Sequence, residues 1–156
     1  MKTQLLLVGK TADKLFAGAI ADYASRIAHY MPFDVQVVPD LRHTKHISQE
    51  QQCSIEGEQL LRLIKGDDFV VLLDEHGAEM RSIELANWLE KRRSQGRRLV
   101  FVIGGPYGFS PAMYERANEK LSLSKLTFSH QMVRLVFVEQ LYRACTIIRG
   151  EPYHHE

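Results

Sequence analysis

The chain shows two recurring hydrophobic patterns, one typical of buried strands and one typical of helices. Short, almost continuous apolar runs predict strands that are covered on both faces of a sheet, at residues 5–8, 69–73 and 100–103. Residues 33–38 alternate enough to predict a further strand. Residues 121–128 also alternate, which indicates either a short half-buried strand or an extended loop.

Between these strands, apolar residues recur at the spacing of amphipathic helices. The predicted helices span residues 12–30, 51–65, 111–120 and 130–149, and another runs from Ser82 to a turn at residues 94–98. Thr11, Ser82 and Ser110 are the expected N-caps, because their hydroxyls can accept from the first free amides of a helix. The helix over residues 130–149 has a wide apolar surface, which predicts that a partner subunit covers part of it.

Strands that alternate with helices predict an α/β fold with a mainly parallel sheet of about five strands. A chain of 156 residues is long enough for one ordinary hydrophobic core, so we expect a single domain over residues 1–156. No repeat, linker or low-complexity segment interrupts it. No apolar run approaches the roughly 20 residues that a membrane span needs, and the first residues do not form a signal peptide. We therefore expect a cytoplasmic protein with no membrane partner.

The charge balance excludes a general nucleic-acid coat, because the net charge is only +1. Any contact with RNA must come from a local patch. The most basic stretch consists of Lys91, Arg92, Arg93, Arg97 and Arg98. This stretch is either a solvated helix end, favoured there by the helix dipole, or a surface that contacts phosphates.

Residues 100–111 read VFVIGGPYGFSP and combine a strand, a glycine-rich turn and a helix start. Glycines allow a ligand to approach the backbone closely, and α/β proteins bind ligands beyond the carboxyl ends of their strands. The spacing matches neither a dinucleotide-binding fingerprint nor a phosphate-binding P-loop. Residues 73–77 and 123–128 follow two other strand positions. Asp74 or Glu75 could hold a ribose hydroxyl or a cationic group, or could simply be turn residues.

Other reactive side chains give weaker signals. His43 and His46 lie in a polar stretch without the carboxylates or thiols of a metal site, so we expect a solvated loop and no metal. Cys145 lies within an apolar helix pattern and is expected in the core, whereas Cys53 is expected to be exposed and unactivated. The C-terminal residues Tyr153, His154 and His155 can bind or exchange protons near neutral pH.

Five segments together resemble the RlmH (YbeA-type) ribosomal RNA methyltransferases of the SPOUT superfamily. They are LLLVGK, LLDEHG, VFVIGGPYGFSP, LSLSKLTFSHQMVRLVFVEQLYRA and RGEPYHHE. The likeness covers nearly the whole chain, and the order and spacing of the segments are its specific part. It implies a SPOUT-type, mainly parallel sheet with helices on both faces and a C-terminal trefoil knot, although chains generally avoid knots.

The resemblance also implies S-adenosylmethionine as the cofactor, held by backbone groups of three loops. The corresponding residues are Leu73, Gly104, Gly105, Leu123, Ser124, Lys125, Leu126, Thr127 and Phe128. It further implies a homodimer that methylates N3 of a pseudouridine in 23S ribosomal RNA, on the assembled ribosome. Relatives often have proline where this chain has Ser129, a departure that bears on the exact shape of the loop before His130 and leaves the assignment of the ligand-binding residues unchanged.

Direct methyl transfer requires the pseudouridine N3–H to lose its proton, which a base or a nearby cation assists. By the resemblance, Arg143 would stabilise the anion or bind phosphate, Tyr153 would stack on the base, and His154 would take or relay the proton. The alternative is a structural Arg143 ion pair and an inert tail. Competing functions are a SPOUT enzyme acting on tRNA, a non-catalytic ribosome-binding factor and a general small-molecule binder.

Overall fold

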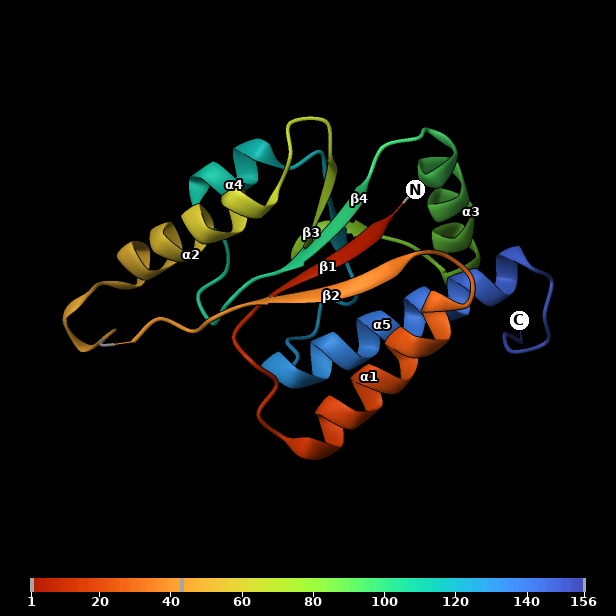
Figure 1. Ribbon diagram of the computed structural model, residues 1–156, viewed down its shortest axis with the longest axis horizontal. Helices are drawn as coiled ribbons and strands as arrows, with labels where there is room; N and C mark the ends of the chain where they lie inside the picture. Colours follow the sequence, from red (N-terminus) through yellow and green to blue (C-terminus); the bar gives the residue numbers. More distant parts are fainter. Residues whose placement is uncertain (1, 43, 156) are drawn as a thin grey trace.

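The computed structural model of the chain describes residues 2–42 and 44–155, and its strands and helices alternate along the sequence (Figure 1). The strands are β1 (Thr3–Val8), β2 (Phe33–Val38), β3 (Phe69–Glu79), β4 (Leu99–Ile103) and β5 (Glu119–Ser122). The helices are α1 (Lys14–Ala28), α2 (Gln49–Leu63), α3 (Ser82–Ser94), α4 (Pro111–Arg116) and α5 (His130–Ile148), with a short 3-10 turn η1 (Thr44–His46). The predicted α/β class is confirmed.

The described strands form one parallel sheet in the order β2-β1-β4-β3-β5. Successive side chains of a strand point to opposite faces, and β1 shows the consequence. Leu5 and Leu7 pack in a core with α1, α3 and α5, whereas Leu6 and Val8 pack in a second core with α2 and α4. Helices therefore cover both faces of the sheet, which explains why β1 and β4 read as continuous apolar runs (Figure 1).

Two helix starts differ from the prediction. Asp13, not Thr11, caps α1, because its carboxylate accepts from the amides of Leu15 and Phe16. Ser82 is the first residue of α3 and not its cap, since its hydroxyl donates to Gln140 on α5. Tertiary partners thus took the hydroxyls that sequence alone assigned to caps. Ser110 does cap α4, as predicted, and accepts from the Met113 amide at 3.3 Å.

The segment between α4 and α5 also differs. The predicted helix over residues 111–120 is wrong after Arg116, because the chain turns there to pair with β3. Asn118 directs this turn: its amide donates to the Val70 carbonyl, and its side-chain oxygen accepts from the Val70 amide at 2.8 Å each. The strand β5 includes residues 121 and 122 and ends at Ser122, so the first part of the segment 121–128 is strand and the rest is a connection that bends at residues 123, 125 and 126.

Strand β3 is longer than the predicted residues 69–73, and its pairing with β5 shifts between Leu73 and Ala78. The shift leaves residues 74–77 outside the regular ladder at the carboxyl edge of the sheet. Gly77 allows this arrangement, since a Cβ atom there would lie 2.6 Å from the Lys120 carbonyl carbon. Within the described residues, no helix is long and apolar enough to cross a membrane.

Most of the basic stretch of residues 91–98 serves the fold. Arg98 donates to both Asp68 oxygens, at 2.9 and 2.6 Å, and Arg97 donates to the Asp67 and Asp68 carbonyls. Arg92 pairs with Glu119 of β5. For these three arginines neither alternative holds, because a guanidinium group paired with protein acceptors is neither simply solvated nor available to phosphates.

Removing the buried Asp68 carboxylate is expected to destabilise the fold strongly. The side chain is 1% exposed, and Asp68→Ala would leave Arg98 half-buried without its carboxylate partner. We expect the free energy of unfolding to fall by about 3–5 kcal/mol in urea denaturation at pH 7. Asp67→Ala, which removes an exposed neighbouring carboxylate, is the control. A loss equal to that of the control would contradict this role for Asp68.

The same pair predicts a pH dependence. Burial alone would raise the pKa of Asp68, but hydrogen bonds from Arg98 and the Lys65 amide, together with the Arg98 and Arg116 charges, lower it. The stabilisation is therefore complete above the unfolded-state value of about 3.9 and is lost as the pH falls through the lower folded-state value. The difference between wild type and Asp68→Ala should accordingly shrink in acid.

Candidate functional site

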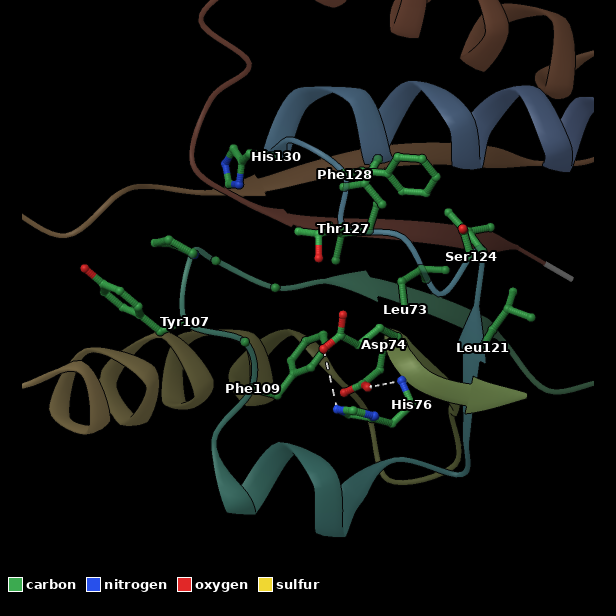
Figure 2. Close-up of a pocket in the computed structure, with 18 of the residues that line it drawn as sticks. Leu73, Asp74, His76, Tyr107, Phe109, Leu121, Ser124, Thr127, Phe128 and His130 are labelled. Atoms are coloured by element: carbon green, nitrogen blue, oxygen red, sulfur yellow. Dashed lines mark hydrogen bonds and ion pairs between the residues drawn. The ribbon is translucent and has the colours of Figure 1, made fainter. Parts of the chain in front are cut away.

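A pocket of about 870 Å³ opens at the carboxyl edge of the sheet (Figure 2). Its walls come from residues 73–76 in β3, from the end of β4 and the loop after it at residues 103–109, and from the connection between β5 and α5. Parallel strands end at the same edge, so the ladders β3–β4 and β3–β5 bring these distant segments together. The three strand positions singled out in the sequence therefore meet in one cavity.

Eight of the nine residues expected to bind the cofactor line this pocket: Leu73, Gly104, Gly105, Leu123, Ser124, Leu126, Thr127 and Phe128. Lys125 does not line it. The Lys125 side chain is 83% exposed, and its Nζ lies 3.8 Å from Glu79. The prediction that Lys125 binds the cofactor is therefore not supported by the lining of this pocket.

The glycines of the β4–α4 loop are required by close packing. The Gly108 amide donates to the Gly105 carbonyl at 3.2 Å, and Gly108 has a φ of 80°, which closes a tight turn. A Cβ atom at Gly104 would lie 3.1 Å from the Phe109 ring, and one at Gly105 would lie 2.6 Å from the Glu56 carboxylate. The backbone at residues 104 and 105 consequently faces the cavity without side chains of its own.

Carboxylates dominate the charge of the pocket. The described lining includes Asp40, Asp74 and Glu75 but neither lysine nor arginine. Asp74 accepts hydrogen bonds from the Tyr114 hydroxyl and the His76 amide. Burial, and then the bond to Asp74, raises the pKa of Tyr114 to about 12, so its phenol stays neutral. Such a lining favours a cationic ligand and disfavours phosphates.

One side of the pocket is held by a buried arginine that sequence reasoning missed. Arg134 of α5 is fully buried and donates to the Val8 carbonyl at 2.6 Å and to the Thr11 hydroxyl at 2.8 Å. It also lies 3.1 Å from the ring of His130, which lines the pocket. Burial, followed by the Arg134 charge, lowers the pKa of His130, so its ring is neutral at pH 7. The sequence signal that could have identified Arg134 is a charged residue within the apolar pattern of this helix.

The three predicted catalytic residues gather around Glu139 at the other end of α5. Glu139 Oε1 accepts from Arg143 at 2.6 Å and from the Tyr153 hydroxyl at 2.9 Å. Arg143 also lies 3.1 Å from His154 Nδ1, and its guanidinium sits 4.7 Å from the centre of the Tyr153 ring. Burial and hydrogen bonds with Tyr23 and Glu139 raise the pKa of Tyr153. We call Glu139, Arg143, Tyr153 and His154 the tail cluster.

The pocket and the tail cluster are far apart within one chain. Arg143 follows His130 by thirteen residues of continuous helix. At 1.5 Å per residue, the two positions are separated by about 20 Å. Figure 1 agrees, since the C-terminal tail lies at the end of α5 opposite to the one that meets the strand ends. A single chain therefore does not bring Arg143, Tyr153 and His154 to the pocket.

The remaining candidates are mostly structural. The expectation that Cys53 is exposed is wrong: it is buried, and its thiol lies 3.3 Å from the Tyr107 carbonyl. Cys145 is buried in the core as predicted, and burial raises its pKa to about 11. His46 lies in η1, and His43 falls outside the described residues. No group of potential metal ligands occurs in the part of the chain that the structure describes.

Comparisons with known proteins agree with this architecture. Residues 1–154 match the family model described as "Predicted SPOUT methyltransferase". Proteins named ribosomal RNA large subunit methyltransferase H from Phocaeicola vulgatus, Bacteroides fragilis and Porphyromonas gingivalis are 57%, 55% and 53% identical, each over 100% of both chains.

Two solved structures share the fold. A methylase family protein from Haemophilus influenzae superimposes with a TM-score of 0.53 at 12% identity, covering 99% of this chain and 70% of its own. A methylase family protein from Neisseria gonorrhoeae gives 0.51 at 12% identity, over 99% of this chain and 86% of its own. These two show the fold alone.

The Glu139 carboxylate should hold the tail against α5. Glu139→Ala removes the acceptor of both Arg143 and Tyr153. Each lost hydrogen bond to a charged group contributes about 1.5–3 kcal/mol, so amide hydrogen exchange over residues 150–155 should accelerate at least about tenfold. Mass spectrometry of the C-terminal peptide measures this rate, with Glu90→Ala on the exposed face of α3 as control. Unchanged exchange would show that other contacts order the tail.

Proposed function

Because the chain belongs to the SPOUT methyltransferase family, we propose that it methylates N3 of a pseudouridine in 23S ribosomal RNA, with S-adenosylmethionine as donor. The observation that carries this proposal is the end-to-end likeness to proteins named ribosomal RNA large subunit methyltransferase H. A ribosomal substrate places the reaction in the cytoplasm. The likeness supports the reaction class, and the pocket supports the donor.

S-adenosylmethionine suits the chemistry of the pocket. The donor carries a sulfonium cation, and Asp40, Asp74 and Glu75 give the lining a negative charge. A Cβ atom at Gly104 would lie against Phe109 and Gly108 of the lining, so its absence leaves main-chain groups of residues 104 and 105 accessible to an adenosine. The residues that would hold the donor are Leu73, Gly104, Gly105, Leu123, Ser124, Leu126, Thr127 and Phe128. When bound, the donor supplies an electrophilic methyl group.

The tail cluster would act on the acceptor base. Arg143 is a permanent cation, and a guanidinium next to the base stabilises the anion that forms when N3 loses its proton. Tyr153 remains a neutral phenol because its pKa is raised, so stacking on the base suits it better than proton transfer. Its ring already lies beside the Arg143 guanidinium.

The contact with Arg143 specifies what His154 can do. A guanidinium only donates, so His154 Nδ1 accepts, and the neutral ring carries its proton on Nε2. In this tautomer an Nε2–H group that reaches the substrate would act as a hydrogen-bond donor and stabilise the anion. The ring must leave Arg143 before Nδ1 can take the N3 proton. The geometry thus favours anion stabilisation over proton abstraction as the role of His154.

The separation of the two sites supports a homodimer. Leu15, Leu126 and Met132 are exposed large apolar side chains, and they lie on or beside the starts of α1 and α5 near the pocket. A second copy would cover them and could place its tail cluster beside this pocket. We also propose that the segment from β5 to α5 is threaded as a trefoil knot, in keeping with its position beside β3 and β4 in the pocket wall.

The charge distribution favours an assembled ribosome as substrate. A net charge of +1 gives little general attraction for free RNA, and Arg92, Arg97 and Arg98 are committed to the fold. An enzyme of this kind recognises a preformed surface and does not grip an extended RNA chain.

Transfer of a labelled methyl group from S-adenosylmethionine tests the proposal. Ribosomes, free large subunits, naked 23S RNA and tRNA from cells without this modification are the acceptors. We expect label at pseudouridine N3 on intact ribosomes, and a decrease of at least about 100-fold in kcat for Arg143→Ala. Gly105→Val should abolish donor binding in a folded dimer, because its side chain enters the space of the Glu56 carboxylate.

Other outcomes would contradict the proposal in different ways. Label on tRNA alone would identify another substrate for the same chemistry. Absence of both label and donor binding in calorimetry would instead identify a non-catalytic ribosome-binding factor. Normal donor binding by Gly105→Val would show that the glycine-rich loop is not the donor site.

A further inference from the structure

Helix α2 packs one face against the glycine-rich loop of the pocket. Cys53, Glu56 and Gly57 lie three and four residues apart, so their side chains share that face. The Cys53 thiol donates to the Tyr107 carbonyl and lies 3.7 Å from that of Gly108. A Cβ atom at Gly57 would collide with the Ser110 hydroxyl. The loop is therefore supported along its length by a helix that lines none of the pocket itself.

Glu56 is the unusual member of this face. The residue is only 3% exposed, and its Oε2 accepts one hydrogen bond, from Gln52 at 3.2 Å. Its Oε1 is buried without a hydrogen-bond partner in residues 2–42 and 44–155. The two carboxyl oxygens lie 2.6 and 2.9 Å from the position of a Cβ atom at Gly105. The carboxyl group thus fills the space that a side chain at position 105 would occupy.

The surroundings of Glu56 favour its uncharged form. Asp40, from the loop after β2, and Cys53, on the same helix, are the ionisable groups that interact with it. Two further ionisable groups, Tyr107 of the loop and Tyr114 of α4, belong to the lining of the neighbouring pocket. Burial, with a smaller contribution from Asp40, raises the pKa of Glu56, and the bond from Gln52 opposes this. An ionised Glu56 would be a buried charge whose pKa no cation of residues 2–42 and 44–155 lowers, and such a charge is costly.

We propose that Glu56 is a positioning residue for the methyl-donor site, whose uncharged carboxyl group supports Gly105 from behind and holds the loop in its binding conformation. This inference rests on the proposed function, because it assumes that S-adenosylmethionine occupies the pocket. Glu56 acts through the loop and does not touch the donor. An ionised or truncated side chain at position 56 lets the loop leave that conformation, and donor affinity falls.

Calorimetric titration with S-adenosylmethionine tests this role in the full-length protein. Glu56→Ala should raise the donor Kd at least tenfold, whereas Glu56→Gln, which keeps the shape and stays neutral, should remain within about threefold of wild type at a pH below the raised pKa of Glu56. Glu58→Gln, on the exposed side of the same helix, is the matched control and should bind normally. In steady-state assays, Glu56→Ala should raise KM for the donor and leave KM for the ribosome unchanged.

The pH profile distinguishes positioning from simple packing. Wild-type affinity should fall as the pH rises through the raised pKa of Glu56, above its ordinary value of 4.5, because the uncharged form binds. Glu56→Gln should lack this fall. His130 and the donor itself titrate in both proteins, so the difference between the two curves reports Glu56 alone.

A second comparison of variants separates a specific effect on the loop from misfolding of Glu56→Ala. Gly105→Ala places a methyl group against the Glu56 carboxyl, so it should weaken binding much more in wild type than in the Glu56→Ala background. The inference would be overturned if Gly105→Ala raised the donor Kd by the same factor in both backgrounds. It would also be overturned if Glu56→Ala bound the donor normally, or if wild type and Glu56→Gln gave parallel pH curves. If wild type itself failed to bind the donor, both this inference and the proposed function would fall.

Discussion

The parallel pairing of β3 with both β4 and β5 is the constraint on which the pocket depends. Ladder hydrogen bonds place Leu73 opposite Ile103 and Leu121, so three segments distant in sequence leave the sheet at one edge. Gly77 allows β3 to approach the backbone of β5 closely, and Gly105 leaves room for the Glu56 carboxyl group of α2 behind the glycine-rich loop. Pocket shape is thus set by backbone packing, and this is why most of its predicted binding residues are small or apolar.

Helix α5 links the two chemically distinct parts of the chain. Its first turn borders the pocket through His130, and its end carries Arg143 within the tail cluster. A continuous helix is stiff, so the distance between the two parts cannot be closed by bending within one chain. The exposed apolar residues near the start of α5 offer the surface through which a second copy can close it. In that arrangement dimerisation would be a requirement of catalysis.

Sequence reasoning found the features that depend on local pattern. The apolar run before Gly104 predicted a buried strand, and Ser110 with Pro111 predicted the start of α4. The strand ends that form the pocket were also identified, since polarity of parallel strands follows from the fold class. The likeness to a known family supplied the residues of the tail, whose assembly around Glu139 the structure shows.

Features that depend on tertiary partners could not be predicted from the sequence. Asp13 caps α1 where Thr11 was expected, while the Thr11 hydroxyl accepts from Arg134. Cys53 and Glu56 stand on a mostly polar helix, so nothing in the local pattern predicted that the glycine-rich loop would bury them. Such sites are determined by which surface of a helix another segment happens to cover, which periodicity does not reveal.

In the proposed homodimer the pocket of one copy would work with the tail cluster of the other, and mixing two inactive variants tests this arrangement. Gly105→Val disables the pocket, and Arg143→Ala disables the tail cluster. After subunit exchange, half of the dimers contain one of each, and a site shared between copies is intact once in each mixed dimer. Methyl transfer to ribosomes should then recover to about one quarter of the wild-type rate. No recovery in verified mixed dimers would contradict this arrangement, because a site contained within one chain stays disabled in both variants.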